Sequence, residues 1–341
     1  MLPWVECPSL NLRLDVSPVD RIAMIPDAVV QRSRELLAAV QAEIPGGKQW
    51  LADVVHLRTR YRFLAETKAN ANRVGVNWRD LTLANLSYEL VVGMFACSTI
   101  VLPTATGPVL ARNMDFWPEK WLARASVLMR FTRGDQLAFV NAGWPGAIGV
   151  VSGLSARGFA VVLNAVGSFG GIDKQGYPVL LHLRRVVEDA ASFDAAVEWL
   201  SSERLMAGAL FTVAGTENHQ RVVVERTPTK FALRRPSGDE PLITTNDYRM
   251  LSATGAKTAH QLLQTSCSRY DSLCRCFTTH QPTEPVDDAR FLYALTDPSV
   301  KQSITAQHMI FRPRDNSARL FAPRNLVCDD EPTDSIALRT A

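Results

Sequence analysis

The spacing of apolar residues predicts helices in the first part of the chain. Apolar side chains recur there every three or four positions, which is typical of helices that bury one face. Pro26 and Asp27 open the first helix, and the side chain of Asn77 can cap the last one. The predicted helices cover residues 26–44, 50–70 and 77–95. A short apolar–polar alternation over residues 10–16 is the strand-like pattern in this part.

From Cys97 onward the pattern changes to short β-rich segments separated by turn residues, which is typical of antiparallel sheets. The predicted strands cover residues 98–102, 109–116, 126–132, 137–143, 147–152, 159–164, 210–214, 221–225, 231–234 and 242–245. Between residues 179 and 202 the spacing predicts two helices, the second capped by Ser192. The chain is therefore expected to be α+β, with a helical segment over residues 1–96 and a body of two sheets flanked by helices over residues 97–341.

Composition narrows the class of protein. The chain has 341 residues, of which 47% are apolar and 21% charged, as in ordinary globular proteins. A net charge of +3 argues against a nucleic-acid binder. No apolar run is long enough to span a bilayer, and the first residues lack the basic head and apolar core of a signal peptide, so a cytoplasmic location is expected. The six cysteines and six histidines are scattered, which predicts neither a disulfide framework nor a metal site.

The residues that could take part in catalysis lie where the helical segment meets the first strand. Cys97 begins that strand, and the strand that returns after a short turn carries Arg112 and Asp115. Two strands joined by a short turn place their ends side by side, so thiol, guanidinium and carboxylate can share one site.

These three groups would work together if Cys97 were the first residue of a chain. Its α-amine, with a pKa of about 7.7 to 8.0, could then accept the proton of a thiol with a pKa of about 8.5. Asp115 would hold the resulting ammonium, and Arg112 would favour the thiolate and the charge on a substrate carbonyl. Two ordinary interpretations stay open at this point: a small buried hydrophobe for Cys97, and a surface ion pair for Arg112 and Asp115.

Three stretches of sequence carry a resemblance to a known family. They are residues 87–90 (Ser-Tyr-Glu-Leu), residues 97–101 (Cys-Ser-Thr-Ile-Val) and residues 112–116 (Arg-Asn-Met-Asp-Phe). They resemble the acid ceramidase and N-acylethanolamine acid amidase group of the cysteine N-terminal-nucleophile hydrolases, to which penicillin V acylase and bile salt hydrolase also belong. The resemblance extends from about residue 3 to about residue 325.

The resemblance implies a precursor that cuts itself between Ala96 and Cys97. Residues 1–96 would form a helical α chain and residues 97–341 a β chain, and the two chains would stay associated. It also implies a four-layer αββα sandwich preceded by the helical segment.

Further site residues follow from the same resemblance. Asn246 would stabilise the oxyanion through its side-chain amide, and Asn164 through its backbone N–H or its side chain. Arg269 resembles an arginine of the bile salt hydrolase branch, whereas the ceramidase arginine has no match at its own distance. Ala165 stands where the ceramidase pattern has an acidic residue. The alternatives are a turn residue for Asn246 and a surface arginine at the start of a helix for Arg269.

The activity that the resemblance implies is hydrolysis of the linear amide bond of an N-acyl lipid amide, such as a ceramide or an N-acylethanolamine. The acyl group would pass through a thioester on Cys97, and no metal or organic cofactor would take part. Two alternatives stay open: an acyltransferase that delivers the acyl group to an amine, and a catalytically silent lipid-binding homologue. Trp50 and the basic residues 58–62 would allow transient contact with a membrane or micelle. The oligomeric state and the particular acyl and amine groups stay open.

Overall fold

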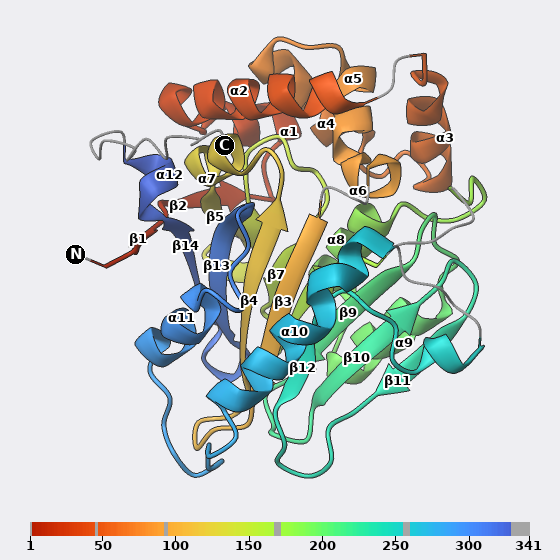
Figure 1. Cartoon of the computed structure of the whole chain (residues 1–341). Coiled ribbons are helices and arrows are strands. Elements are labelled where there is room, and N and C mark those ends of the chain that lie inside the picture. Colours follow the sequence, from red (N-terminus) through yellow and green to blue (C-terminus); the bar gives the residue numbers. More distant parts are fainter. Residues whose placement is uncertain (1, 45–46, 92–94, 167–171, 255–259, 329–341) are drawn as a thin grey trace, which may run out of the picture.

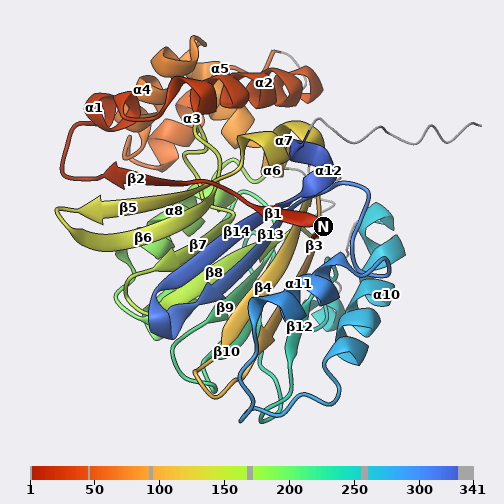
Figure 2. The same cartoon turned by 90° about the vertical axis from the view of Figure 1, so that its left-hand side faces the viewer.

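The computed structural model describes residues 2–44, 47–91, 95–166, 172–254 and 260–328. Two β-sheets stack face to face, with helices on the outer face of each, so the body has four layers (Figure 1 and Figure 2). The N-terminal helices lie across one end of this sandwich (Figure 1).

The smaller sheet has six antiparallel strands. Their order is β1 (Trp4–Glu6), β14 (Ser317–Pro323), β13 (Thr305–Arg312), β4 (Val109–Phe116), β3 (Phe95–Leu102) and β12 (Leu242–Thr244). The paired strands β3 and β4 lie inside the sheet, and β4 is buried along its whole length. The outer face of this sheet is covered by α10 (His260–Cys276) and α11 (Asp288–Thr296) (Figure 2).

The larger sheet has eight strands. Their order is β11 (Phe231–Arg234), β10 (Arg221–Arg226), β9 (Ala209–Ala214), β8 (Phe159–Asn164), β7 (Ser152–Ser155), β6 (Gln136–Gly143), β5 (Val127–Arg133) and β2 (Ser9–Arg13). Neighbouring strands are antiparallel except β2, which runs parallel to β5. The outer face is covered by α8 (Val179–Asp189) and α9 (Phe193–Ser202), and the predicted cap Ser192 accepts the Ala195 N–H.

The remaining helices lie at the ends of the sandwich. They are α1 (Pro18–Ala23), α2 (Asp27–Glu43), α3 (Trp50–Arg58), α4 (Leu64–Val74), α5 (Trp78–Asn85), α6 (Ser87–Leu90), α7 (Glu119–Ala125), α12 (Arg324–Val327) and the 3₁₀ turns η2 (Leu251–Thr254) and η3 (Pro313–Asp315).

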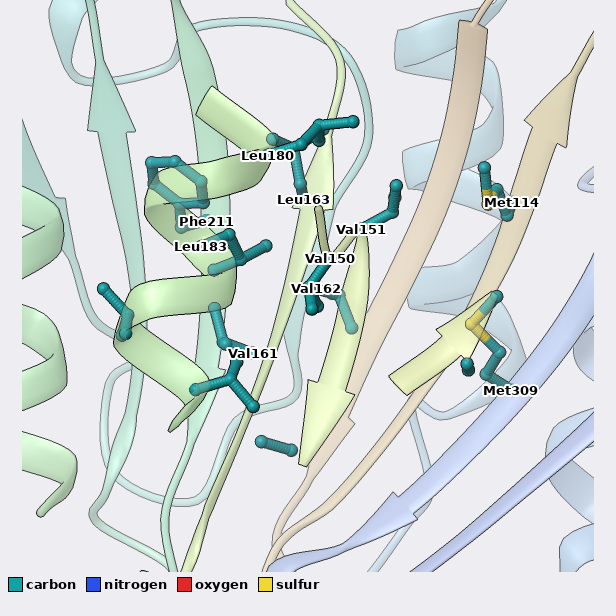
Figure 3. Close-up of a cluster of buried hydrophobic side chains, with 14 of the residues drawn as sticks. Met114, Val150, Val151, Val161, Val162, Leu163, Leu180, Leu183, Phe211 and Met309 are labelled. Carbon is teal, nitrogen blue, oxygen red and sulfur yellow. The ribbon is translucent and has the colours of Figure 1, made fainter. Parts of the chain in front are cut away.

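The main apolar core extends through the layers. Figure 3 shows Leu180 and Leu183 of α8 on one side of β8, with Met114 and Met309 of the smaller sheet on the other side. Every residue of β8 is buried, because a helix covers one face of the strand and the second sheet covers the other.

Three predicted elements differ from the structure. The single helix over residues 50–70 is two helices, α3 and α4, because Arg60 and Tyr61 adopt left-handed backbone conformations that end the first one. The helix over residues 77–95 ends much earlier, since α5 and α6 together stop at Leu90 and β3 already begins at Phe95. The strand over residues 147–152 lies later, at β7.

The N-terminal segment also contributes to both sheets. Its strand β1 pairs with β14 in the smaller sheet, and its strand β2 pairs with β5 in the larger one. The segment is therefore part of the sandwich as well as a helical cover over one end of it.

Candidate active site

Cys97 and Arg112 lie in contact, as the predicted hairpin required. Cys97 is opposite Met114 in the register of β3 and β4 and is 2% exposed. Arg112 is completely buried and donates one guanidinium N–H to the Cys97 sulfur, with Nη2 and Sγ 2.7 Å apart. A second N–H donates to the Ser152 hydroxyl at 2.8 Å, which fixes the guanidinium plane. The interpretation of Arg112 as a surface residue is therefore wrong.

Burial raises the pKa of the Cys97 thiol. The charge of Arg112 lowers that pKa, as expected, whereas the charge of Asp115 raises it. Burial is the largest of these influences, so the thiol of the continuous chain keeps its proton. Reaction at the sulfur then requires a base that accepts this proton.

Asp115 lies opposite Ala96 in the same strand pair and is completely buried. Its Oδ1 accepts the Thr305 hydroxyl at 2.6 Å, whereas Oδ2 has no hydrogen-bond partner within the described ranges. Burial raises the pKa of Asp115, although Arg269 and the Thr305 hydroxyl lower it. A buried carboxylate oxygen without a donor is costly, so this position suits a cation beside the Ala96–Cys97 peptide bond.

Asn246 and Arg269 hold the backbone of Cys97. The Asn246 Oδ1 accepts the Cys97 N–H at 2.9 Å and a guanidinium N–H of Arg269 at 2.8 Å. Arg269 also donates to the Cys97 carbonyl and, at 2.9 Å, to the Ser98 hydroxyl. Arg269 lies inside α10 and is 1% exposed, so the alternative of a surface arginine at a helix start is wrong. The predicted amide donor of Asn246 is engaged elsewhere, because its Nδ2 donates to the Ala165 carbonyl at 2.7 Å.

Asn164 supports the site from β8. Its Oδ1 accepts the Thr99 hydroxyl at 2.7 Å, and its Nδ2 donates to the carbonyls of Thr244 and Thr245, each at 3.0 Å. These bonds tie the two sheets together next to Cys97 and use the whole side-chain amide. The role of Asn164 as an oxyanion donor stays a prediction.

Several supporting residues escaped the sequence analysis. Ser152 orients Arg112, Thr305 holds Asp115, and the Ser266 hydroxyl accepts the Asn246 N–H at 2.8 Å. All three lie far along the chain from the residues they hold, and serine and threonine are too common for their types to mark them. The structure thus places Arg112, Asn246 and Arg269 in direct hydrogen-bond contact with Cys97. Asp115 lies opposite Ala96, and Asn164 is bonded to Thr99 two positions along the strand.

A narrow cavity lies between the N-terminal helices and the body, and none of the six candidate site residues lines it. It has a volume of about 30 Å³ and is lined by α2, α4, α5 and α6 on one side and by Phe116 and Trp144 on the other. The Phe116 ring stacks on Phe95, with ring centroids 4.4 Å apart, and Phe95 precedes Cys97 by two positions on the same face of β3. The apolar walls therefore approach the thiol along the strand.

No group of three or more His, Cys, Asp or Glu side chains in the described ranges is arranged to hold a metal ion. Within the same ranges, no helix has the length and apolar character needed to cross a membrane.

The sandwich agrees with the similarity to known proteins. The solved structure of the Caenorhabditis elegans N-acylethanolamine-hydrolyzing acid amidase ortholog superposes with a TM-score of 0.54 at 20% identity, covering 64% of this chain and 93% of that one. This likeness confirms the predicted αββα fold. A sequence profile of the acyl-coenzyme A:6-aminopenicillanic acid acyl-transferase family matches residues 103–307, more than half of the chain. The chain belongs to this family.

Two curated relatives refine the similarity within the family. N-acylethanolamine-hydrolyzing acid amidase of Oryctolagus cuniculus is 26% identical over 236 residues, which are 64% of this chain and 64% of that protein. Acid ceramidase of Balaenoptera acutorostrata scammoni is 26% identical over 188 residues, which are 48% of this chain and 47% of that protein. Each alignment therefore spans less than two thirds of its relative. These matches confirm the resemblance to the ceramidase and acid amidase group.

Proposed function

We propose that this protein is a self-processing amidase that hydrolyses N-acyl lipid amides, with Cys97 as its nucleophile. The observation that carries the proposal is the 2.7 Å contact between the Arg112 guanidinium and the Cys97 sulfur in a completely buried site. A guanidinium at this position stabilises negative charge on the sulfur and on an adjacent carbonyl oxygen.

The first reaction is the cut between Ala96 and Cys97. The sulfur attacks the Ala96 carbonyl carbon, and the proton that the thiol releases passes to the Cys97 nitrogen as the C–N bond breaks. This leaves a thioester between Ala96 and the sulfur, and water opens it to a carboxylate on Ala96 and a free thiol. Bonds from Asn246 and Arg269 hold the Cys97 N–H and carbonyl throughout. The unpartnered Oδ2 of Asp115 supports this step, because it can receive the new ammonium.

The second reaction is hydrolysis of the substrate amide. The free α-amine of Cys97 accepts the thiol proton while the sulfur attacks the substrate carbonyl, and the same amine passes the proton to the leaving amine. Arg112 stabilises the charge that develops in this step. Water then attacks the acyl thioester and releases a fatty acid, so no metal or cofactor takes part.

The substrate class follows from the cavity and the relatives. The cavity beside Phe95 and Phe116 is apolar, which suits an acyl chain rather than a peptide. A volume of about 30 Å³ cannot hold such a chain, so the helices must move away from Phe116 and Trp144 before substrate enters. The two curated relatives are named for ceramide and N-acylethanolamine, both of which are lipid amides.

The two chains should stay together after the cut. The part before Cys97 supplies strands to both sheets, and backbone ladders of this kind do not depend on the peptide bond at residue 96. Contact with a membrane or micelle stays a prediction, and the exposed residues Trp50, Leu57 and Tyr61 are the ones to test.

A cysteine substitution tests the proposal. Cys97→Ala is expected to run as one intact chain on a denaturing gel and to lose hydrolysis of an N-acylethanolamine and a ceramide. The matched control Cys276→Ala changes an exposed cysteine on α10 and should behave as wild type. Cleavage of either substrate by Cys97→Ala would rule the nucleophile out.

The name of the matched family favours one second candidate, acyl transfer to an amine instead of water. Both reactions share the thioester and differ only in the group that opens it. Incubation with an N-acyl amide and a competing primary amine separates them: hydrolysis yields free fatty acid, whereas transfer yields the new amide.

A further inference from the structure

Helix α10 sends two neighbouring side chains into the candidate active site. The helix packs against strands β3 and β12 on the outer face of the smaller sheet (Figure 1). Arg269 contacts Cys97 directly, whereas Ser266 contacts Asn246. The two residues are three positions apart, so their side chains share one face of the helix. Ser266 is completely buried, and the reactions described above assign it no role.

The Ser266 hydroxyl has a defined direction. Its oxygen accepts the Asn246 backbone N–H at 2.8 Å, and its proton is donated to the Oδ1 of Asp247. The Thr245 hydroxyl lies 2.8 Å from the same oxygen, but a carboxylate is the stronger acceptor and therefore takes the proton. Asp247 is itself paired with Arg249, whose Nε lies 3.2 Å from Oδ2. The lone pairs of the Ser266 oxygen are thus left for the Asn246 N–H.

This bond fixes a residue that the sheet does not hold. Asn246 lies beyond the end of β12, so Ser266 supplies an anchor for its backbone. The side chain has an anchor of its own, because its Nδ2 donates to the Ala165 carbonyl at 2.7 Å. With both parts held, the Oδ1 accepts the Cys97 N–H at 2.9 Å. Asn246 therefore presents an acceptor to the nitrogen of Cys97.

We propose that Ser266 is a positioning residue, which holds Asn246 so that its Oδ1 accepts a hydrogen bond from the Cys97 nitrogen before and after the cut. The inference rests on the proposed role of Cys97 as nucleophile and of its α-amine as base. In the processed enzyme, the bond to Asn246 keeps that amine beside the sulfur and stabilises its protonated form. Neither Ser266 nor Asn246 lines the apolar cavity, so the effect falls on the reaction and not on binding of the acyl chain.

The expected change in the pH profile has a definite sign. The charged side chains of this network, within the described residues, are Arg112 and Asp115 of β4, Arg269 of α10, and Asp247 with its partner Arg249. Loss of the Ser266 hydroxyl removes none of these charges. A weaker bond from Asn246 destabilises the ammonium and so lowers the pKa of the amine. Because the amine must be unprotonated to accept the thiol proton, the acid limb of kcat/KM moves to lower pH.

The same helix offers a matched control. Ser272 is also buried on α10, and its hydroxyl accepts an N–H of Arg275 at 2.8 Å and donates to the Ser268 carbonyl at 2.9 Å. These bonds stay within the helix. Ser266→Ala and Ser272→Ala each remove one buried hydroxyl that both accepts and donates, so they separate the contact with Asn246 from the general cost of losing such a group.

The test compares wild type, Ser266→Ala, Ser272→Ala and Cys97→Ala, with urea denaturation as the measure of folding. Ser266→Ala should lower kcat for an N-acyl amide about tenfold with KM unchanged, and move the acid limb of kcat/KM to lower pH. Ser272→Ala should keep the wild-type kcat, KM and pH profile. Ser266→Cys keeps the volume of the side chain but is only a weak acceptor, so it tests the same bond if the alanine variant does not fold.

Each outcome decides the matter. A wild-type kcat and pH profile without the Ser266 hydroxyl would overturn its role, and so would equal changes in Ser266→Ala and Ser272→Ala. If Ser266→Ala does not process, the self-cleavage rate replaces kcat, and a rate equal to that of Ser272→Ala has the same meaning. Failure of the proposed function would appear separately, as amide hydrolysis by Cys97→Ala.

Discussion

The N-terminal segment, residues 2–91, and the body, residues 95–328, are held in place in different ways. Inside the body, strands such as β4 and β8 are buried along their whole length, and the site is a network of buried polar side chains between packed layers. The N-terminal segment joins the body through its two strands, through apolar side chains that share two buried clusters with the body, and through a set of individual polar contacts. Inside the body, buried polar bonds position the reactive groups, whereas apolar packing and a few separate polar bonds connect the body to the segment that the predicted cut would detach.

Several of these polar contacts join a residue before the predicted cut to a residue after it. The Asn85 Oδ1 accepts the Ile148 N–H at 2.7 Å, and the Glu89 Oε1 accepts the Val179 N–H at 2.7 Å. Glu66 forms an ion pair with Arg184 at 3.5 Å. Each contact belongs to one side chain, so a single substitution removes it. The effect of such a substitution can then be compared with the effect of a substitution at the candidate active site.

The largest effect is expected inside the body, at Arg112. Arg112→Ala removes the only guanidinium that contacts the sulfur in the described part of the chain, and it leaves the charge of the reaction uncompensated. The rates of self-cleavage and amide hydrolysis should fall about 1,000-fold, which corresponds to about 4 kcal/mol. Arg157→Ala, which changes an exposed arginine in a turn, is the control. Near-normal rates in Arg112→Ala would contradict the account of the site.

The next largest effect is expected at Glu66, whose side chain connects the N-terminal segment to the body. Its carboxylate pairs with Arg21 at 3.1 Å as well as with Arg184, and both guanidinium groups are buried. Glu66→Ala leaves these charges with less compensation, so the free energy of unfolding should fall by about 2 to 3 kcal/mol. Urea denaturation in the uncut Cys97→Ala background measures the loss. A change below about 1 kcal/mol would show that the strands and the shared apolar clusters hold the segment without this carboxylate.

A smaller, pH-dependent effect is expected at Glu89. Burial raises the pKa of Glu89 to about 7, and its Oε2 has no hydrogen-bond partner in the described ranges. A carboxyl whose pKa is raised on folding adds stability below its unfolded pKa of about 4.5 and loses that contribution as pH rises through about 7. Relative to Glu89→Gln, wild type should therefore lose about 1 to 2 kcal/mol between pH 4.5 and 7. Parallel stability curves for the two proteins would contradict this.

The smallest effect is expected at Asp15, on the surface of the N-terminal segment. Its ion pair with Arg13 joins side chains that are 35% and 50% exposed, so solvent screens it. Asp15→Asn should leave the midpoint of urea denaturation unchanged within the error of the measurement. The substitution also serves as the control for Glu66→Ala. A loss of stability as large as that of Glu66→Ala would show that the buried ion pairs of Glu66 contribute no more than this exposed pair.

Local signals explain why much of the fold could be predicted. The strands Val109–Phe116 and Phe159–Asn164 have the predicted bounds, because turn residues and apolar runs mark both ends. Ser192 caps α9 as its position in sequence indicated. The break between α3 and α4 could not be predicted, because the apolar spacing continues across the left-handed residues Arg60 and Tyr61.

Distance along the chain explains what could not be predicted about the site. The hairpin brought Arg112 to Cys97 because a short turn joins their strands. The bond from Arg269 to the Cys97 carbonyl spans 172 positions, and the bond from Thr305 to Asp115 spans 190. Only the assembled layers bring such residues together. Resemblance suggested Arg269, whereas neither pattern nor resemblance pointed to Thr305.

N-terminal sequencing of the larger chain in active enzyme tests the central claim most directly. The account predicts that this chain begins at Cys97, with residues 1–96 present as a second chain that copurifies with it. A fully active enzyme that consists of one intact chain, or whose larger chain begins at any other residue, would contradict the account.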